Sequence, residues 1–152
     1  RVLKDRDYFR GLIRAIDGAQ REIVICTYLF RANGHPGSYP DRVIERLLRA
    51  AGRGVRVEVI LERSEDPIDA VNRDNEATRL RLERGGVRTK MDSPRRTTHA
   101  KLAVVDRRYT FVGSHNLTHS ALKYNREFSI LIDSPAVAEE ALRYIRTVVP
   151  ED

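Results

Sequence analysis

The sequence has a single cysteine, Cys26, which excludes an internal disulfide framework and any zinc site built from several cysteines. Long apolar runs are also missing, because no stretch approaches the roughly 20 residues that a membrane-spanning helix needs. The longest run, residues 23–30, is interrupted by Thr27 and is typical of a buried strand. With 41% hydrophobic and 33% charged residues, the composition is that of a folded globular chain rather than a disordered one.

The length and the charge of the chain set further bounds. Its 152 residues fit a single domain, residues 1–152, and its formal net charge is +6. A basic surface suits a polyanionic partner such as nucleic acid or an anionic lipid surface, although a merely solvated arginine-rich surface has the same composition. The chain starts at Arg1 rather than Met, so we expect a fragment or a processed form, and the compartment stays open.

Hydrophobic periodicity predicts alternating helices and strands in the first half of the chain and closely spaced strands in the second half. Because strands joined through helices pair in parallel, the first half indicates a parallel sheet, and the later strands indicate an antiparallel portion. We therefore expect an α/β fold with a mixed, mostly parallel β-sheet flanked by helices. Asp41 is the expected N-cap of the second helix, and Pro67 is the expected start of the third. The predicted helices span residues 5–20, 41–52, 67–84 and 134 onward, and the predicted strands span residues 23–30, 55–61, 87–91, 99–105, 109–112 and 127–132.

Chemically useful side chains concentrate in one stretch, HAKLAVVDRRYTFVGSHN, which spans residues 99–116. On a strand, alternate side chains share a face, so His99 and Lys101 should point the same way. Ser114 and Asn116 have the same spacing at the end of the next predicted strand. If the two strands pair, an imidazole, an ammonium, a hydroxyl and an amide converge on one region, and such groups suit a phosphate.

Asp106 breaks this parity. On a regular strand its side chain faces away from those of His99 and Lys101, towards the turn at Arg107 and Arg108. We therefore assign Asp106 a structural role in holding that turn, an argument that a β-bulge would reverse.

The spacing His-x-Lys, four residues, Asp, six residues, Gly-Ser-x-Asn resembles the HKD signature of the phospholipase D superfamily. A match at all six fixed positions occurs by chance on the order of once in tens of millions of positions at average composition. The resemblance covers roughly residues 22–133, because AAGRGVRVEVIL, LERGGVRTK and NREFSILID resemble the units that flank the motif in this family. The matched residues are His99, Lys101, Asp106, Gly113, Ser114 and Asn116.

This resemblance implies a phospholipase D-like fold and a phosphodiesterase that needs neither a metal nor another cofactor. Family members use two HKD motifs per active site, and single-motif members, such as the small dimeric endonucleases, take the second from a twofold-related subunit. Since this chain has one motif, the resemblance implies a C2 homodimer with a shared site. One His99 would attack phosphorus and form a phosphohistidine, while the other would protonate the leaving oxygen and then activate water. Lys101 and Asn116 of both subunits would hold the phosphate.

Glu127 matches the family's acidic residue beyond the motif. We predict that it accepts a hydrogen bond from the Nδ1–H of His99 and so fixes the tautomer that leaves a lone pair on the attacking nitrogen. The alternative is a solvated carboxylate at a strand edge.

Three further residues are candidates for substrate binding. His115 stands where the family usually has a small residue, and its side chain should point away from the reacting groups. With His119 it forms an HxxxH pattern, but zinc binding lacks an adjacent third ligand, so both histidines should line the substrate entrance or stay exposed. Arg95 and Arg96 either contact flanking phosphates without reading sequence or are simply solvated.

Four functional hypotheses follow. The first is a nuclease of low sequence specificity, which the single motif, the compact size and the basic charge favour. The second is a phospholipase D or phosphatidyl-transferring enzyme, for which loops 31–40 and 92–97 are rather polar. The third is an inactive module for binding or assembly, against which the intact motif argues. In the fourth, the chain is half of a longer protein that carries a second motif.

Overall fold

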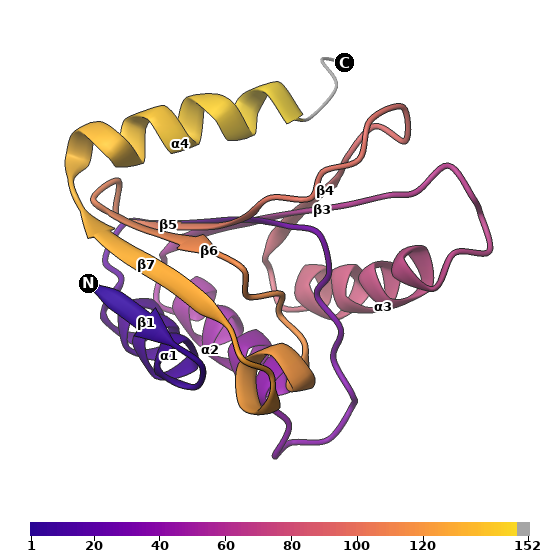
Figure 1. The fold of residues 1–152 in the computed structure, drawn as a ribbon, viewed down its shortest axis with the longest axis horizontal. Helices are drawn as coiled ribbons and strands as arrows, with labels where there is room; N and C mark the ends of the chain where they lie inside the picture. Colours follow the sequence, from indigo (N-terminus) through magenta and orange to yellow (C-terminus); the bar gives the residue numbers. More distant parts are fainter. Residues whose placement is uncertain (149–152) are drawn as a thin grey trace.

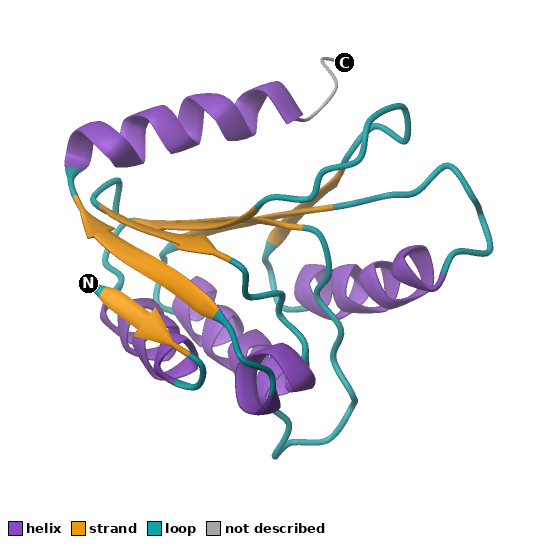
Figure 2. Cartoon of the chain, in the orientation of Figure 1, coloured by secondary structure: helices purple, strands orange, loops and turns teal. Residues whose placement is uncertain are grey.

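A computed structural model, which describes residues 1–148, has a seven-stranded mixed sheet between two layers of helices (Figures 1 and 2). The strand order across the sheet is β1-β7-β6-β5-β2-β3-β4. Along the chain the elements are β1 (Val2–Lys4), α1 (Asp7–Gly18), β2 (Glu22–Thr27), α2 (Tyr39–Gly52), β3 (Arg56–Leu61), α3 (Ala70–Arg84), β4 (Arg88–Met91), β5 (Lys101–Val105), β6 (Tyr109–Gly113), the π-helical turn η1 (Ser120–Tyr124), β7 (Phe128–Asp133) and α4 (Pro135–Val148).

The direction of the strands changes across the sheet. β2, β3 and β4 pair in parallel, whereas β5 pairs antiparallel with β2, and β6, β7 and β1 continue the antiparallel part. The mixed α/β sheet with flanking helices is thus confirmed. The expectation that the sheet is mostly parallel is wrong, since only two of the six neighbouring pairs are parallel. Short connections force the later strands into antiparallel pairs, and the three-residue β1, which the sequence pattern did not reveal, adds one more.

The two faces of the sheet are covered unequally. Helices α1, α2 and α3 lie on one face, and α4 alone lies on the other (Figure 1). The strand β2 is buried on both sides, because Ile23 and Ile25 face the larger core while Val24 and Cys26 pack beneath α4. Among the described residues, no helix combines the length and the apolar character needed to cross a membrane.

The start of α2 differs from the sequence prediction. Its N-cap is Ser38 rather than Asp41, and the Ser38 hydroxyl accepts a hydrogen bond from the Asp41 N–H at 3.4 Å. The Asp41 carboxylate is buried and accepts hydrogen bonds from the N–H groups of Asn33 (2.8 Å) and Gly34 (3.1 Å). Asp41 therefore fixes the preceding loop instead of capping the helix.

The start of α3 also differs. Pro67 lies in the turn before the helix, which begins at Ala70 with Asp69 as its N-cap. The Asp69 carboxylate accepts a hydrogen bond from the Val71 N–H at 2.9 Å. A side chain that can accept this bond satisfies one of the free N–H groups of the first turn, which proline at residue 67 cannot do.

Candidate active site

All the motif residues except Asp106 meet where β5 begins and β6 ends. Since these strands are antiparallel, the start of one lies beside the end of the other, and Leu102 pairs with Val112. A cavity of about 630 Å³ opens there. It is lined by His99, Ala100, Lys101, Leu102, Val112, Gly113, Ser114 and Asn116. The convergence expected from the sequence spacing is therefore present in a single chain, although His99 lies just before β5 rather than within it.

His99 and Lys101 lie next to each other in the wall of the cavity. The Lys101 Nζ lies 3.2 Å from Nδ1 of the exposed His99 ring and donates a hydrogen bond to the His99 carbonyl oxygen at 2.7 Å. Burial lowers the pKa of Lys101, and the negative charge of Glu127 opposes that shift. An ammonium group at this distance favours the tautomer in which Nδ1 has the lone pair and Nε2 carries the proton.

Tyr28, which follows β2, packs against this pair. Its ring centroid lies 4.8 Å from that of His99, and the Lys101 Nζ lies 5.6 Å from the ring centroid. The register of the sheet explains this contact, because Thr27 at the end of β2 pairs with Lys101. The alternation pattern of β2 alone could not reveal it, since it depends on which strand lies next to β2.

Ser114, in the cavity wall, is bonded to Glu127, which lines a neighbouring hollow instead of the cavity itself. The Ser114 hydroxyl donates to the Glu127 carboxylate and accepts from the Phe128 N–H at 3.0 Å. Asn125 donates to the same carboxylate at 3.2 Å. Within the described chain, Glu127 makes no hydrogen bond to His99, so the predicted bond from the His99 Nδ1–H is not found. Lys101 occupies that side of the imidazole instead.

Asn116 contributes an atom that the chain itself does not use. It is half-buried and lines the cavity, and its Oδ1 has no hydrogen-bond partner among the described residues. Buried polar atoms are nearly always paired, so an unpaired one at a cavity wall is available to a ligand.

Gly113 has a packing reason for its place in the motif. A Cβ atom on this residue would lie 2.4 Å from the Ser129 Cα and 2.5 Å from the Phe128 carbonyl oxygen. The close approach of β7 to β6 therefore requires glycine, and it brings Ser114 within reach of Glu127.

Asp106 lies at the opposite end of the hairpin from the cavity. Its carboxylate accepts hydrogen bonds from the N–H groups of Gln20 (3.0 Å), Arg21 (2.8 Å) and Glu22 (3.1 Å). Burial alone would raise the pKa of Asp106, but these backbone donors hold it below its ordinary value. Asp106 thus fixes the segment before β2, whereas the sequence had suggested that it holds its own turn, Arg107-Arg108.

His115 does not line the cavity, which corrects its assignment to substrate binding. It is buried, with Nδ1 2.6 Å from the Ser129 hydroxyl and Nε2 2.8 Å from the Asp5 carbonyl oxygen, and its ring stacks on that of Tyr8. Burial lowers the pKa of His115 and favours its neutral form. The side chain does point away from the reacting groups as expected, but into the core rather than towards solvent.

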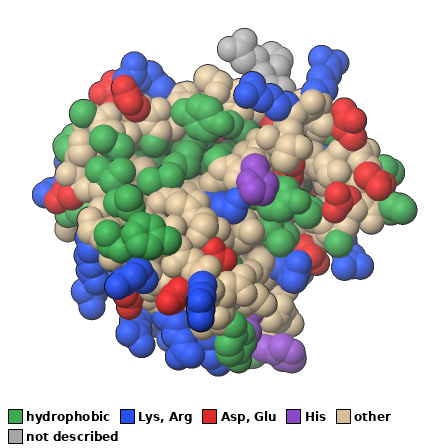
Figure 3. All heavy atoms as spheres, in the orientation of Figure 1, with side chains coloured by type: hydrophobic (Ala, Val, Ile, Leu, Met, Phe, Trp, Pro, Cys, Tyr) green, Lys and Arg blue, Asp and Glu red, His purple; other side chains and the backbone are tan. Residues whose placement is uncertain are grey.

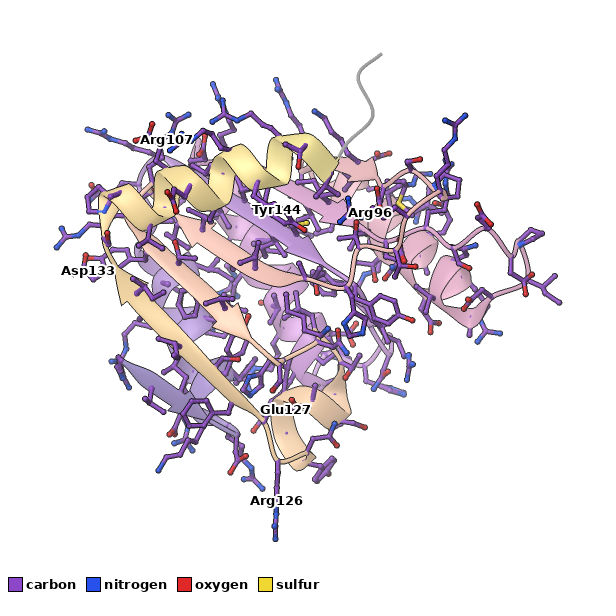
Figure 4. The ribbon with its side chains drawn as sticks, turned by 45° about the horizontal axis from the view of Figure 1, so that its top comes forward. Arg96, Arg107, Arg126, Glu127, Asp133 and Tyr144 are labelled. Atoms are coloured by element: carbon purple, nitrogen blue, oxygen red, sulfur yellow. The ribbon has the colours of Figure 1, made fainter. Side chains whose placement is uncertain are left out.

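Arg95 and Arg96 are exposed on the loop before the motif. Arg96 lines a different cavity of about 290 Å³ with Asp92, Thr98 and Tyr144. Figure 4 places Arg96 and Tyr144 beside the C-terminal part of α4. Neither arginine lines the cavity of His99 in a single chain.

No group of three or more His, Cys, Asp or Glu side chains is placed to hold a metal ion in residues 1–148. The two histidines of the HxxxH pattern have separate partners, because His119 accepts a hydrogen bond from the Tyr39 N–H at 3.2 Å while His115 lies in the core. Burial raises the pKa of Cys26 to about 12, so the thiol stays neutral.

Comparison with known proteins gives a consistent picture. The family model described as "Cardiolipin synthase, PLD-like domain" matches residues 12–149. Cardiolipin synthase B of Shigella flexneri is 34% identical over 130 residues, which make up 83% of this chain and 28% of that protein. Phospholipase D of Rickettsia conorii is 28% identical over 129 residues, which make up 84% of this chain and 57% of that protein. The chain therefore spans between about a quarter and just over half of these relatives.

A solved structure shares the whole fold. The crystal structure of Nuc, a phospholipase D family member from Salmonella typhimurium, superimposes with a TM-score of 0.79 at 23% identity. The match covers 97% of this chain and 93% of that chain. At this level of identity the likeness supports the arrangement of sheet and helices, and the motif residues carry the chemical argument.

Proposed function

Because the chain belongs to the phospholipase D superfamily, whose members are phosphodiesterase-type enzymes, we propose that it cleaves phosphodiester bonds through a covalent intermediate on His99. The observation that carries this proposal is the cavity in which His99, Lys101 and Asn116 converge. An exposed imidazole, a partly desolvated ammonium and an amide with an unpaired atom are the groups that a phosphoryl centre needs.

The proposed reaction has two steps and needs two histidines. In the first step, the ring nitrogen of one His99 that has the lone pair attacks phosphorus, a P–N bond forms, and the bond to the leaving oxygen breaks as a second, protonated histidine gives that oxygen its proton. In the second step, that histidine takes a proton from water, whose oxygen attacks phosphorus and breaks the P–N bond. The two steps therefore need one neutral and one protonated imidazole in the same site.

A second copy of the chain is the proposed source of the second histidine. The sequence carries one motif, and the sheet face beside the cavity is apolar and open: Val112, Phe128 and Ile130 are 37%, 54% and 40% exposed. Figure 3 shows apolar side chains gathered over the region of β6 and β7. A twofold-related copy on this face would bury these side chains and bring two motifs together. Because the chain spans 28% of cardiolipin synthase B, a second motif in a longer protein is the alternative source.

Nucleic acid is the proposed substrate. A second hollow, of about 460 Å³, shares Ser114 with the active-site cavity and is lined by Lys4 and Arg126 together with the acidic Asp5 and Glu127. Cationic side chains along such a path suit the neighbouring phosphates of a polynucleotide, and the net charge of +6 favours any polyanion. These contacts would follow the backbone and would not read sequence.

Phospholipid is the second candidate substrate. Its support is the family description and the names of the curated relatives, together with the apolar Leu102 and Val112 in the cavity wall. The chemistry at phosphorus is the same, and transfer to an alcohol instead of water would make a phosphatidyl transferase.

Cleavage assays in excess EDTA test the proposal. Wild type, His99→Ala and the control His35→Ala would be offered single-stranded DNA, duplex DNA, RNA and a phosphatidylglycerol dispersion. His35 is an exposed histidine outside both cavities, so its loss should leave activity unchanged. Nucleic-acid cleavage that only His99→Ala loses supports the nuclease, and lipid turnover alone keeps the mechanism but replaces the substrate. If His99→Ala is as active as wild type, catalysis through His99 fails, and if nothing is cleaved, an inactive binding module takes the place of the enzyme.

A further inference from the structure

Two carboxyl groups are buried together beside Thr98, the residue that precedes the motif. Glu62 follows β3 and Asp92 follows β4, and these strands are neighbours in parallel, so their carboxyl ends meet at one edge of the sheet. Glu62 is 2% exposed and Asp92 is 3% exposed. Buried carboxyl groups are rare unless each is paired or neutral, so this pair needs an explanation.

Glu62 holds the backbone that leads into His99. Its Oε1 accepts hydrogen bonds from the Arg63 N–H at 3.0 Å and from the Thr98 N–H at 3.3 Å. Thr98 is itself buried and is the residue immediately before His99. The carboxyl group of Glu62, just after β3, thus holds the backbone of the residue that precedes the motif histidine.

Asp92 holds the side chain of the same threonine. The Thr98 hydroxyl donates a hydrogen bond to the Asp92 carboxyl, while the Thr98 N–H donates to Glu62. Two carboxyl groups held side by side by one buried threonine repel each other when both are charged, and a proton on one of them relieves this repulsion. We call the three residues, Glu62, Asp92 and Thr98, the carboxyl clamp.

The surroundings supply no cation that would let both acids ionise. Within residues 1–148 neither Glu62 nor Asp92 forms an ion pair, although Arg96 and Tyr144 line the small cavity next to Asp92. The remaining titratable neighbour is the thiol of Cys26 on β2, which is neutral. Burial, together with the adjacent Asp92, raises the pKa of Glu62, although the Thr98 and Arg63 N–H groups oppose the shift.

The clamp is also tied to the second support of the histidine. Asn75 on α3 donates hydrogen bonds to the carbonyl oxygens of Glu62 and Tyr28, each at 3.0 Å. Tyr28 is the residue whose ring packs against His99. The buried side chain of Asn75 therefore fixes the backbone of two residues, Glu62 and Tyr28, that both support His99.

We propose that the carboxyl clamp is a positioning device for His99, in which one proton shared by Glu62 and Asp92 keeps Thr98 seated and the imidazole aimed at phosphorus. The inference rests on the proposed function, since positioning has meaning only for a reacting His99. When the proton leaves, two adjacent carboxylates repel each other and the segment that carries His99 loses its anchor.

Two substitutions at Thr98 test the positioning role. Thr98→Val keeps the shape of the side chain but removes the hydroxyl, and kcat should fall about 10-fold to 100-fold with KM little changed, because small misplacements of a reacting group have effects of this size. Thr98→Ser restores the hydroxyl and should restore most of kcat. Equal kcat in wild type and Thr98→Val would overturn the positioning role.

Glu62→Gln tests the shared proton. The amide keeps an acceptor for the two N–H groups and donates permanently to Asp92, so it mimics the protonated acid. Because the folded-state pKa of Glu62 is raised, wild type should lose stability as pH rises from about 4.5 through that pKa. Glu62→Gln should lose less stability over the same rise in pH. Its urea midpoint should therefore exceed that of wild type by a margin that grows with pH. Parallel pH curves for the two proteins would overturn the shared proton.

The two experiments, kinetics of the Thr98 variants and unfolding of Glu62→Gln, separate the inference from the proposed function. If wild type turns over no substrate, the proposed function fails, while the unfolding curves still decide whether the proton is shared. If wild type is active and both experiments show no difference, the carboxyl clamp fails and the catalytic role of His99 stands.

Discussion

The two ends of the β5–β6 hairpin carry parts of one sequence motif but differ in what their polar groups contact. At the turn end, the Asp106 carboxylate is occupied by three backbone N–H groups. At the cavity end, His99 is exposed and Asn116 has a polar atom without a partner in the described chain. Figure 4 places Arg107 and Asp133 at the first end and Glu127 at the other.

This difference separates the residues that build the fold from those that are free to react. A polar group that the chain has already satisfied contributes to stability, and a group that the chain leaves open is available to a substrate. Substitutions at the cavity end should therefore change activity and leave stability alone, and substitutions at the turn end should do the reverse.

The largest effect is expected for His99→Asn. Loss of the nucleophile should lower kcat by on the order of 10⁴-fold or more, while the free energy of unfolding changes by less than about 0.5 kcal/mol because the ring is exposed. If each site needs two His99 side chains, an equal mixture of mutant and wild-type subunits should retain about one quarter of the wild-type activity. Activity proportional to the wild-type fraction would show that each chain works alone.

Lys101→Gln should have the next largest effect. Loss of the positive charge beside the reacting phosphate should lower kcat by about 10²-fold to 10³-fold. Stability should hold or rise slightly, since burial already disfavours the charged form of Lys101. Steady-state kinetics and urea unfolding of the same preparation separate the two effects. A loss of unfolding free energy as large as the rise in the activation free energy of kcat would contradict the contrast between the two ends of the hairpin.

The sequence alone predicted which side chains gather at the cavity end, because the motif spacing reflects strand periodicity. Side-chain alternation along a strand and antiparallel pairing within a hairpin both follow from the local sequence. Together they are enough to bring His99, Lys101, Ser114 and Asn116 into one cavity wall. The roles of His115 and Glu127 were harder to predict, since each has a partner that the motif spacing does not reveal: Asp5 for His115 and Ser114 for Glu127.

Long-range register also explains the residues that the sequence did not reveal. Tyr28, Glu62 and Thr98 belong to three separate segments, and only the order of β2, β3 and β5 in the sheet brings them behind His99. The parallel share of the sheet was overestimated for a related reason. Periodicity identifies strands, but it does not say that β5 inserts next to β2 in the antiparallel direction.

Asp106→Ala should lower stability rather than activity. Three N–H groups of residues 20–22 would lose a charged acceptor, and after allowance for partial exposure we expect a loss of about 2 to 3 kcal/mol. Because the folded-state pKa of Asp106 is lowered, its contribution is present above about pH 4 and disappears as the pH falls through that folded-state value. The difference in urea midpoint between wild type and variant should therefore shrink in acid. The folded fraction of Asp106→Ala should keep the wild-type kcat.

The smallest effect is expected for Asp133→Asn, and it tests whether contact with the backbone, rather than charge at the turn end, is what matters. Asp133 pairs with Arg108 at 2.7 and 3.1 Å, but both side chains are exposed, and such pairs contribute little in salt. The melting temperature in 0.15 M salt should not change measurably. Asp106→Asn makes the same carboxylate-to-amide change at the same end of the hairpin and should lower it, because an uncharged oxygen replaces a carboxylate that three N–H groups share. Equal losses for the two variants would mean that net charge stabilises this end, and the division between the two ends of the hairpin would then have to be abandoned.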